Sequence, residues 1–200
     1  MEPQPEKRHI AIFASGNGTN AENITAYFNN GNNQAYEVAL IVCNKPDAMV
    51  LQRAEKLGVP SKVISKAQIN DQETMLELLE GYSIDLIVLA GFLLMIPPFL
   101  LEHYRDRIIN IHPSLLPKYG GKGMFGHHVH EAVVAAHEKE TGITVHIVDE
   151  RCDEGRIIFQ ASTPLSASDT PDDVERKVHS LEREHFPRVI EQTLASLPNR

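Results

Sequence analysis

The stretch "HIAIFASGNGTNAEN", residues 9–23, sets the class of fold. "HIAIFA" has the apolar character of a buried β-strand, "SGNGTN" is typical of a tight turn, and a helical pattern begins near residue 20. Further apolar runs that resemble buried strands occur at 37–43, 85–91 and 107–112, with helical patterns between them. Strands that alternate with helices along a chain predict an α/β fold with a mostly parallel sheet.

Two helical segments carry recognisable signals at their ends. "NDQETMLELLEGY" opens with Asn70 and Glu73 at the spacing of a capping box. The last helical segment begins with Thr170 as N-cap and Pro171 at the first helical position. Pro187 lies inside this segment, and because proline removes a backbone hydrogen bond we expect it to kink or break the helix.

The last third of the chain has a different pattern. "GITVHIVDE" (142–150) and "GRIIFQASTPL" (155–165) predict two strands joined by a short connection, which favours an antiparallel extension. The predicted fold class is therefore α/β: a mostly parallel, Rossmann-like open sheet with helices on both faces and an antiparallel strand extension near the C-terminus. No repeat or linker interrupts the pattern, so we expect a single domain over 1–200, with residues 1–8 disordered.

Composition excludes several classes of function. The 200 residues include 19 Lys and Arg against 27 Asp and Glu, a formal net charge of −8, which disfavours nucleic-acid binding. Cys43 and Cys152 are too few for a disulfide framework and favour a cytoplasmic protein. The N-terminus lacks a signal-peptide pattern, and the longest apolar run, 86–101, contains two prolines and is too short to span a membrane.

The turn after the first strand predicts an anion site. Glycines allow backbone N–H groups to approach an anion, and a helix N-terminus adds a favourable dipole, so we expect Gly18, Thr19 and Asn20 to hold a phosphomonoester. The alternative is a tight turn without a ligand. The turn also matches a short dinucleotide pattern, but the second strand ends in Asn44 and Lys45 rather than an acidic residue, which disfavours NAD and leaves NADP a small opening.

"RIINIHPSLLPKYG", residues 107–120, ends a strand with two polar side chains. Asn110 and His112 are two residues apart and project to the same side, and Pro113 ends the pairing. An amide and an imidazole side by side form a donor pair suited to an oxyanion, whereas the alternative is a histidine satisfied by a backbone carbonyl. A protonated histidine needs a carboxylate partner. The candidates left open are Asp149, Glu150, Asp153 and Glu154.

A third group of polar residues, "HHVH", contains His127, His128 and His130. Together with His112 or Asp153 they could form the zinc site of a metal-dependent hydrolase. No further ligand set with metal spacing is evident, so we favour solvent-facing residues that open a helix, and we expect no metal.

Four motifs occur in a fixed order: "SGNGTN", "DLIVLAGF", "NIHPSLLPKY" and "HIVDERCDEG". On these motifs the chain resembles the glycinamide ribonucleotide formyltransferases, from about residue 10 to about residue 190. The resemblance implies transfer of a formyl group from the co-substrate 10-formyltetrahydrofolate to the amine of glycinamide ribonucleotide in purine biosynthesis. It implies small-molecule partners only, and a monomer or a homodimer.

The resemblance also implies roles for particular residues. Relatives carry an arginine that holds the folate tail where this chain has Gln72, and Lys66 could take that contact. The segment 120–126 is part of a stretch longer than in some relatives. The implied roles are catalytic for Asn110, His112 and Asp153; substrate-binding for Gly18, Thr19, Asn20 and Glu182; and folate-binding for Leu93, Leu94, Met95, Ile96 and Asn110.

Other classes of protein give alternative interpretations. Formyltetrahydrofolate deformylases use a similar Asn, His and Asp, but generally carry an N-terminal regulatory domain for which the residues before the first strand leave no room. Methionyl-tRNA formyltransferases share "HPSLLP" but add a C-terminal RNA-binding domain that we do not expect here. A non-catalytic folate- or phosphate-binding module is the non-enzymatic alternative.

Overall fold

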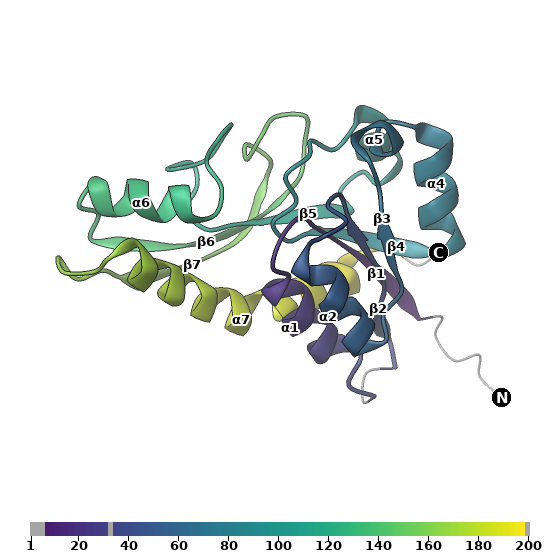
Figure 1. The fold of residues 1–200 in the computed structure, drawn as a ribbon, viewed down its shortest axis with the longest axis horizontal. Coiled ribbons are helices and arrows are strands. Elements are labelled where there is room, and N and C mark those ends of the chain that lie inside the picture. The colour runs from purple at the N-terminus through teal and green to yellow at the C-terminus, as the bar shows by residue number, and fades with distance from the viewer. Residues whose placement is uncertain (1–6, 32–33, 199–200) are drawn as a thin grey trace. The chain divides into compact units, whose positions relative to one another are not determined.

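The computed structural model describes residues 7–31 and 34–198. The chain divides into two compact units, Met1–Ile108 with Ile190–Arg200, and Ile109–Val189 (Figure 1). The expected disorder of residues 1–8 falls largely on residues 1–6, outside the described part, whereas Arg8 is the first residue of a strand. The single domain expected over the whole chain stays a prediction.

The first unit contains a parallel sheet. Its strands follow the order β3-β2-β1-β4, and every neighbouring pair is parallel. The Ile87 N–H also donates to the Arg107 carbonyl at 2.9 Å, just before β5 begins. Since β2 and β4 flank β1, the loops that follow β1 and β4 diverge at a switch point of the kind where open α/β sheets bind ligands. The strands are β1 (Arg8–Ala14), β2 (Tyr36–Cys43), β3 (Ser61–Val63) and β4 (Ile84–Leu89).

In the described part of the first unit, four helices connect these strands and a fifth follows β4. α1 packs against α2, and α3 packs against α4. The capping box predicted at Asn70 and Glu73 is wrong: Ser65 and Gln68 form the box, at the start of α3, and Asp71 caps α4 by accepting a hydrogen bond from the Thr74 N–H. The helices are α1 (Thr19–Phe28), α2 (Met49–Leu57), α3 (Lys66–Ile69), α4 (Gln72–Gly81) and α5 (Pro98–His103).

The second unit contains antiparallel strands. β5 (Ile108–His112), whose first residue closes the first unit, pairs antiparallel with β6 (Glu140–Ile147), and β6 pairs antiparallel with β7 (Ile157–Pro164). The helix α6 (His127–Ala135) lies between β5 and β6 in the chain. The predicted α/β class, with a mostly parallel sheet and an antiparallel extension toward the C-terminus, is confirmed.

The last helix, α7 (Pro171–Ser196), continues through Pro187 instead of ending there. The side chains of Phe186 and Ile190 on either side of the proline are fully buried. Their burial offsets the loss of one backbone hydrogen bond, so the break expected from the sequence does not occur. The start of the helix follows the prediction, because the Thr170 Oγ1 accepts from the Asp173 N–H while Asp173 accepts from the Thr170 N–H.

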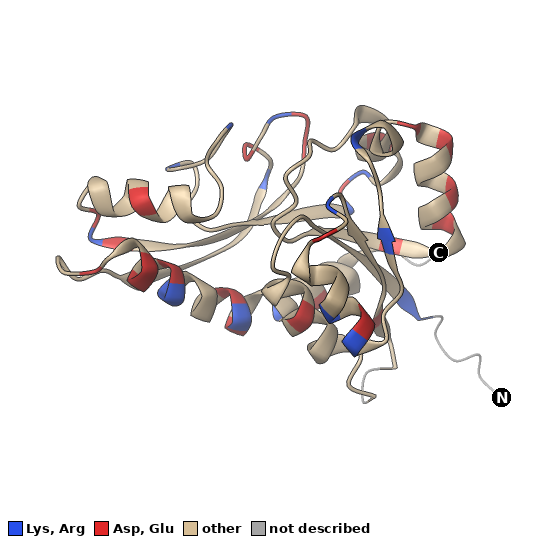
Figure 2. Ribbon diagram, in the orientation of Figure 1, with Lys and Arg blue, Asp and Glu red and all other residues tan. Residues whose placement is uncertain are grey.

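Figure 2 shows acidic and basic residues mixed along α7 and acidic residues along α4. Among the described residues, no helix combines the length and the apolar character that crossing a membrane requires.

Candidate active site

The strand β5 delivers Asn110 and His112 to a buried polar cluster in the second unit. In the antiparallel register Asn110 lies opposite His146 and His112 lies opposite Thr144. His112 is only 4% exposed and His146 only 2% exposed. Residues Ile109 and Ile111, which alternate with the two polar side chains, are buried as well. A strand of alternating polar and apolar residues therefore places a half-buried amide and a buried imidazole on the same side.

Asp153 joins the cluster from the segment between β6 and β7. Its carboxylate oxygens lie 3.5 Å from the His112 Nδ1 and 3.6 Å from the His146 Nε2, and the Gly121 N–H donates to it at 2.9 Å. The Asp153 carboxylate therefore lies next to both the His112 and the His146 imidazole. Of the four acidic residues that the sequence left open, the structure brings Asp153 to His112.

The segment that carries Asp153 is shaped by glycine. A Cβ at Gly155 would lie 1.8 Å from the Ile147 carbonyl oxygen, so no other residue fits there without a backbone shift. Asp153 itself has φ +58°, a left-handed conformation that aspartate tolerates better than most residues. Close packing against β6 therefore fixes where the carboxylate points.

Both potential donors already have partners within the cluster. The His112 Nε2 donates to the Tyr119 carbonyl at 2.7 Å. The Asn110 Nδ2 lies 3.0 Å from the His146 Nε2, and the other His146 nitrogen, Nδ1, contacts the Ile147 carbonyl at 3.1 Å. A substrate oxygen that binds His112 at Nε2 must take the place of the Tyr119 carbonyl.

The electrostatics of the cluster differ from the simple expectation that a carboxylate raises the histidine pKa. Burial lowers the pKa of His112 below its usual value; Asp153 and the Tyr119 carbonyl act in the opposite direction, and His146 adds to the lowering. For Asp153, burial acts to raise the pKa, but the contacts with His146, His112 and the Gly121 N–H outweigh it and hold the pKa below its usual value. Asp153 is therefore ionised at neutral pH.

Thr144 holds the segment after His112 in place. Its buried Oγ1 donates to the Ser114 carbonyl at 2.7 Å and accepts from the Leu116 N–H at 3.0 Å. The Gln160 side-chain amide adds a third hydrogen bond to the same oxygen at 2.8 Å. These bonds tie "HPSLLP" to both β6 and β7, which keeps the end of β5 rigid.

The predicted phosphate loop lies in the first unit, between β1 and α1. Gly18 is the N-cap of α1 with φ +79°, and a Cβ there would lie 2.5 Å from the Val50 Cγ2. No side chain caps this helix end, so backbone N–H groups of its first turn face outward, as an anion site requires. Thr19 is exposed and Asn20 half-buried.

Arg53 on α2 binds the same loop. Its Nε donates to the Asn17 carbonyl at 2.9 Å and one guanidinium nitrogen donates to the Asn17 side chain at 2.9 Å, while the other pairs with Glu22 in the first turn of α1. The guanidinium thereby fixes the loop conformation and brings a positive charge next to the helix N-terminus.

The segment predicted to bind folate follows β4 at the same switch point of the first unit. Ser15 connects it to the end of β1, since the Ser15 Oγ accepts from the Leu93 N–H at 2.9 Å. Leu93 and Met95 are 46% and 60% exposed, Leu94 is half-buried, and Ile96 is buried. Exposed apolar side chains beside a switch point are suited to an aromatic ligand.

Three other residues with predicted binding roles are Glu182, Gln72 and Lys66. Glu182 is 7% exposed on α7 in the second unit, with an oxygen 3.9 Å from the His179 Nε2. Gln72 and Lys66, the two candidates for the folate tail, are exposed first residues of α4 and α3 in the first unit.

The histidines of "HHVH" do not share one site. His127 and His128 are exposed in the first turn of α6, as expected, but the expectation is wrong for His130, which is 2% exposed. His130 belongs to the buried side of α6 together with Val129 and Val133. Burial lowers its pKa to about 4.

Sequence reasoning missed two partners in the cluster, His146 and the Tyr119 carbonyl. The histidine inside the apolar strand "GITVHIVDE" was a usable signal, because buried strands rarely carry an unpartnered imidazole. The sequence gives no indication of the Tyr119 carbonyl as a partner, because every residue has a backbone carbonyl.

The sequence of this chain is similar to those of known formyltransferases. The model of the formyl transferase family matches residues 8–190. The chain is 39% identical over 197 residues to the phosphoribosylglycinamide formyltransferase of Bacillus subtilis, covering 96% of this chain and 97% of the relative. It is 36% identical over 192 residues to the chloroplastic phosphoribosylglycinamide formyltransferase of Arabidopsis thaliana, covering 94% of this chain but 65% of that relative.

Solved structures are also similar. Glycinamide ribonucleotide transformylase 1 from Geobacillus kaustophilus has a TM-score of 0.84 at 36% identity, over 94% of this chain and 100% of that one. Phosphoribosylglycinamide formyltransferase from Coxiella burnetii has a TM-score of 0.84 at 35% identity, over 98% and 90% of the two chains. With the family model matching nearly the whole chain, this protein belongs to the formyl transferase family.

Proposed function

We propose that this protein transfers a formyl group from 10-formyltetrahydrofolate to the amine of glycinamide ribonucleotide, giving formylglycinamide ribonucleotide and tetrahydrofolate. The observation that carries the proposal is the buried cluster in which Asn110, His112 and Asp153 meet at the end of β5. The similarity to phosphoribosylglycinamide formyltransferases over the length of the chain supports the same reaction.

The cluster can lower the barrier to a direct transfer. The substrate amine attacks the formyl carbon, forming a C–N bond while the formyl oxygen becomes an oxyanion. The Asn110 amide and the His112 imidazole donate to that oxygen, and such donors stabilise developing charge most strongly where water is excluded. Collapse of the tetrahedral intermediate breaks the bond to the folate nitrogen, which takes up a proton as it leaves. The scheme needs neither a covalent enzyme intermediate nor a metal.

In this scheme Asp153 has two roles: it favours protonation of His112 and it accepts the proton that the substrate amine loses. Its ionised carboxylate opposes the effect of burial on His112, which favours the imidazolium once an oxyanion is present. The amine loses a proton as it attacks, and Asp153, alone or through a water molecule, is the acceptor with the right charge. Formation of the oxyanion contact requires the Tyr119 carbonyl to leave the His112 Nε2.

The binding roles rest on local features of each unit. Gly18, Thr19 and Asn20 offer the uncapped N-terminus of α1 to the substrate phosphate. Leu93, Leu94, Met95 and Ile96 offer apolar surface to the folate ring. Glu182, which is largely buried, would accept hydrogen bonds from ribose hydroxyls. We expect a cytoplasmic monomer or homodimer.

One assay separates this function from its nearest alternative. The chain is incubated with 10-formyltetrahydrofolate in the presence and absence of glycinamide ribonucleotide, and tetrahydrofolate release is followed. Release that depends on the ribonucleotide, with formylglycinamide ribonucleotide formed in equal amount, is the expected result. Release of formate at the same rate without the ribonucleotide would identify a deformylase, and absence of turnover would leave a binding module.

A further inference from the structure

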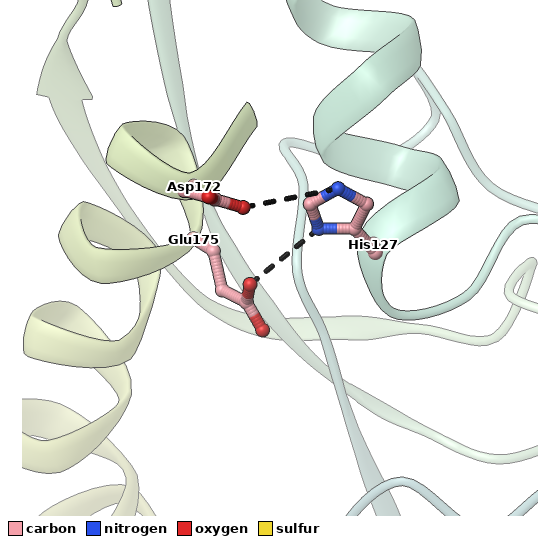
Figure 3. Close-up of side chains that lie close together, drawn as sticks. All are labelled: His127, Asp172 and Glu175. Atoms are coloured by element: carbon pink, nitrogen blue, oxygen red, sulfur yellow. Dashed lines mark ion pairs between the residues drawn. The ribbon is translucent and has the colours of Figure 1, made fainter. Parts of the chain in front are cut away.

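A second polar cluster lies between the first turns of α6 and α7, within the second unit. Figure 3 shows the His127 ring facing Asp172 and Glu175. The His127 Nε2 lies 3.9 Å from the Asp172 Oδ1, and the Nδ1 lies 3.5 Å from the Glu175 Oε2. Glu131, one turn along α6, places an oxygen 3.9 Å from the same Nε2. One imidazole is therefore surrounded by three carboxylates.

Histidines are the basic partners of these carboxylates. In the part of the chain that the structure describes, neither Asp172, Glu175 nor Glu131 forms an ion pair with lysine or arginine. Neighbouring acids on the same stretch are paired with such residues, Asp173 with Arg176 and Asp169 with Lys177. The partners of the three carboxylates are the imidazoles of His127, His128 and His179. When these rings are neutral, the carboxylates leave a negative charge that a cation would neutralise.

The spacing suits a metal ion. One ligand atom each from His127, Asp172 and Glu175 lie within 4.8 Å of one another. Ligands bound at about 2.0–2.2 Å in a tetrahedral site have atoms roughly 3.4 Å apart, so the observed distances require only small side-chain rotations. The three side chains are 46%, 75% and 38% exposed, which leaves them free to make those rotations.

We propose that His127, Asp172 and Glu175 form a binding site for a divalent transition-metal ion, with Zn²⁺ as the representative. An imidazole with two carboxylates is a donor set that such ions accept, whereas Mg²⁺ and Ca²⁺ prefer oxygen ligands alone. Glu131 is close enough to supply a fourth ligand in place of water.

His130 gives an independent indication. It lies one turn after His127, with ring centroids 6.3 Å apart, and its Nδ1 is buried without a hydrogen-bond partner among the described residues. Buried polar atoms normally have partners. A water molecule held by an ion at His127 would give this nitrogen one.

The proposed site is separate from the catalytic cluster and shares no residue with it. A bound ion would link the start of α6 to the start of α7 and thereby fix the far end of the segment 120–126. The near end of that segment supplies the Gly121 N–H to Asp153. Metal binding is thus independent of whether the chain transfers formyl groups.

The test is Zn²⁺ titration of the full-length, chelator-treated protein by calorimetry at pH 7.5. We expect one equivalent to bind, with affinity lowered at least tenfold in each of His127→Ala, Asp172→Asn and Glu175→Gln. His128→Ala is the matched control: this neighbour is 65% exposed and lies 3.3 Å from Glu131, and its loss should leave binding intact.

The melting temperature gives a second measurement of metal binding. The melting temperature of the parent should rise with Zn²⁺, while that of Glu175→Gln, folded normally without metal, should not. Unchanged affinity in His127→Ala and Glu175→Gln would overturn the proposal. Loss of binding in Asp153→Asn alone would place the ion at His112 and His146 and would overturn it as well, and equal affinity for Mg²⁺ would overturn the assignment to a transition metal.

Discussion

Asn110 and His112 are the residues whose loss should matter most for turnover. Removing one donor to a developing oxyanion costs about 10²–10³ in rate, so we expect kcat to fall by that factor in Asn110→Ala and in His112→Ala. Steady-state kinetics with saturating substrates measures the effect. His103→Ala is the matched control, because the His103 side chain on α5 is 41% exposed and its partners are Glu80 and Tyr104, outside the cluster. Equal kcat in the parent and in either site variant would refute the donor roles.

The pKa of His112 offers a test that does not depend on turnover. Burial lowers it and Asp153 partly opposes that effect, so Asp153→Asn should lower the His112 pKa further. NMR titration of the imidazole resonances measures both values. The parent ring should titrate below 6.5, and the variant ring lower still. A higher pKa in the variant would mean that the carboxylate does not act on this ring. Asp149→Asn, which alters a nearby carboxylate outside the cluster, should leave the titration unchanged.

At the scale of residues, the sequence predicted which strand residues lie on one side better than it predicted which partners they contact. The spacing of Asn110 and His112 on a strand was enough to place them on one side, since that follows from strand geometry alone. The choice of Asp153 needed the resemblance to a family, because the conformation between β6 and β7 depends on packing of Gly155 against Ile147. The pairing with His146 depended on the register of two strands about 30 residues apart, which no local pattern specifies.

At the scale of elements, the loop between β1 and α1 depends on glycine for two separate reasons. Gly18→Ala must adopt φ +79° and place a Cβ 2.5 Å from the Val50 Cγ2. We expect a loss of about 2–4 kcal/mol in the free energy of unfolding, measured by urea denaturation. Gly58→Ala is the matched control: its φ is +68° but nothing lies within 4 Å of the added Cβ, so it should cost only about 1 kcal/mol.

A second substitution separates the clash from the backbone strain. Val50→Ala removes the atoms that the new Cβ would meet, so combining it with Gly18→Ala should cost less than the sum of the two single changes. Strict additivity in this double-mutant cycle would show that the clash makes no contribution.

The elements predicted from the sequence were those with a strong local pattern. The long buried strands and the amphipathic helices α1, α2, α4 and α7 were recognised because their periodicity is local. The three-residue strand β3 has no buried side chain, and the short helix α5 begins at the second of two consecutive prolines, so neither had a clear pattern. The continuation of α7 through Pro187 was also missed, because it depends on burial of Phe186 and Ile190 rather than on intrinsic propensity.

At the scale of the whole molecule, a buried neutral histidine makes folding stability depend on pH. The pKa of His130 is lowered to about 4 in the folded state, whereas the unfolded chain binds the proton near 6.5. Between these values the unfolded state holds more protons, so the free energy of unfolding should fall as the pH drops from 6.5 to 4, by about 2 kcal/mol from this residue.

His130→Gln removes this titration. Urea denaturation at pH 7, 5.5 and 4.5 should show a shallower loss of stability in the variant than in the parent, whatever the stability of each at pH 7. His103→Gln changes an exposed histidine of α5 that does not contribute to the lowered pKa of His130, so this control should retain the slope of the parent. Parallel curves for the parent and His130→Gln would contradict a buried neutral imidazole.

The Tyr119 carbonyl that occupies the His112 Nε2 has a consequence for inhibition. In the proposed reaction the formyl oxygen would bind where this carbonyl now binds. Because the carbonyl is part of the chain, it is always present to compete with a ligand for the His112 Nε2. A compound that presents an oxyanion to the His112 Nε2 must displace this carbonyl, so its net affinity is lowered by the hydrogen bond that the protein already makes.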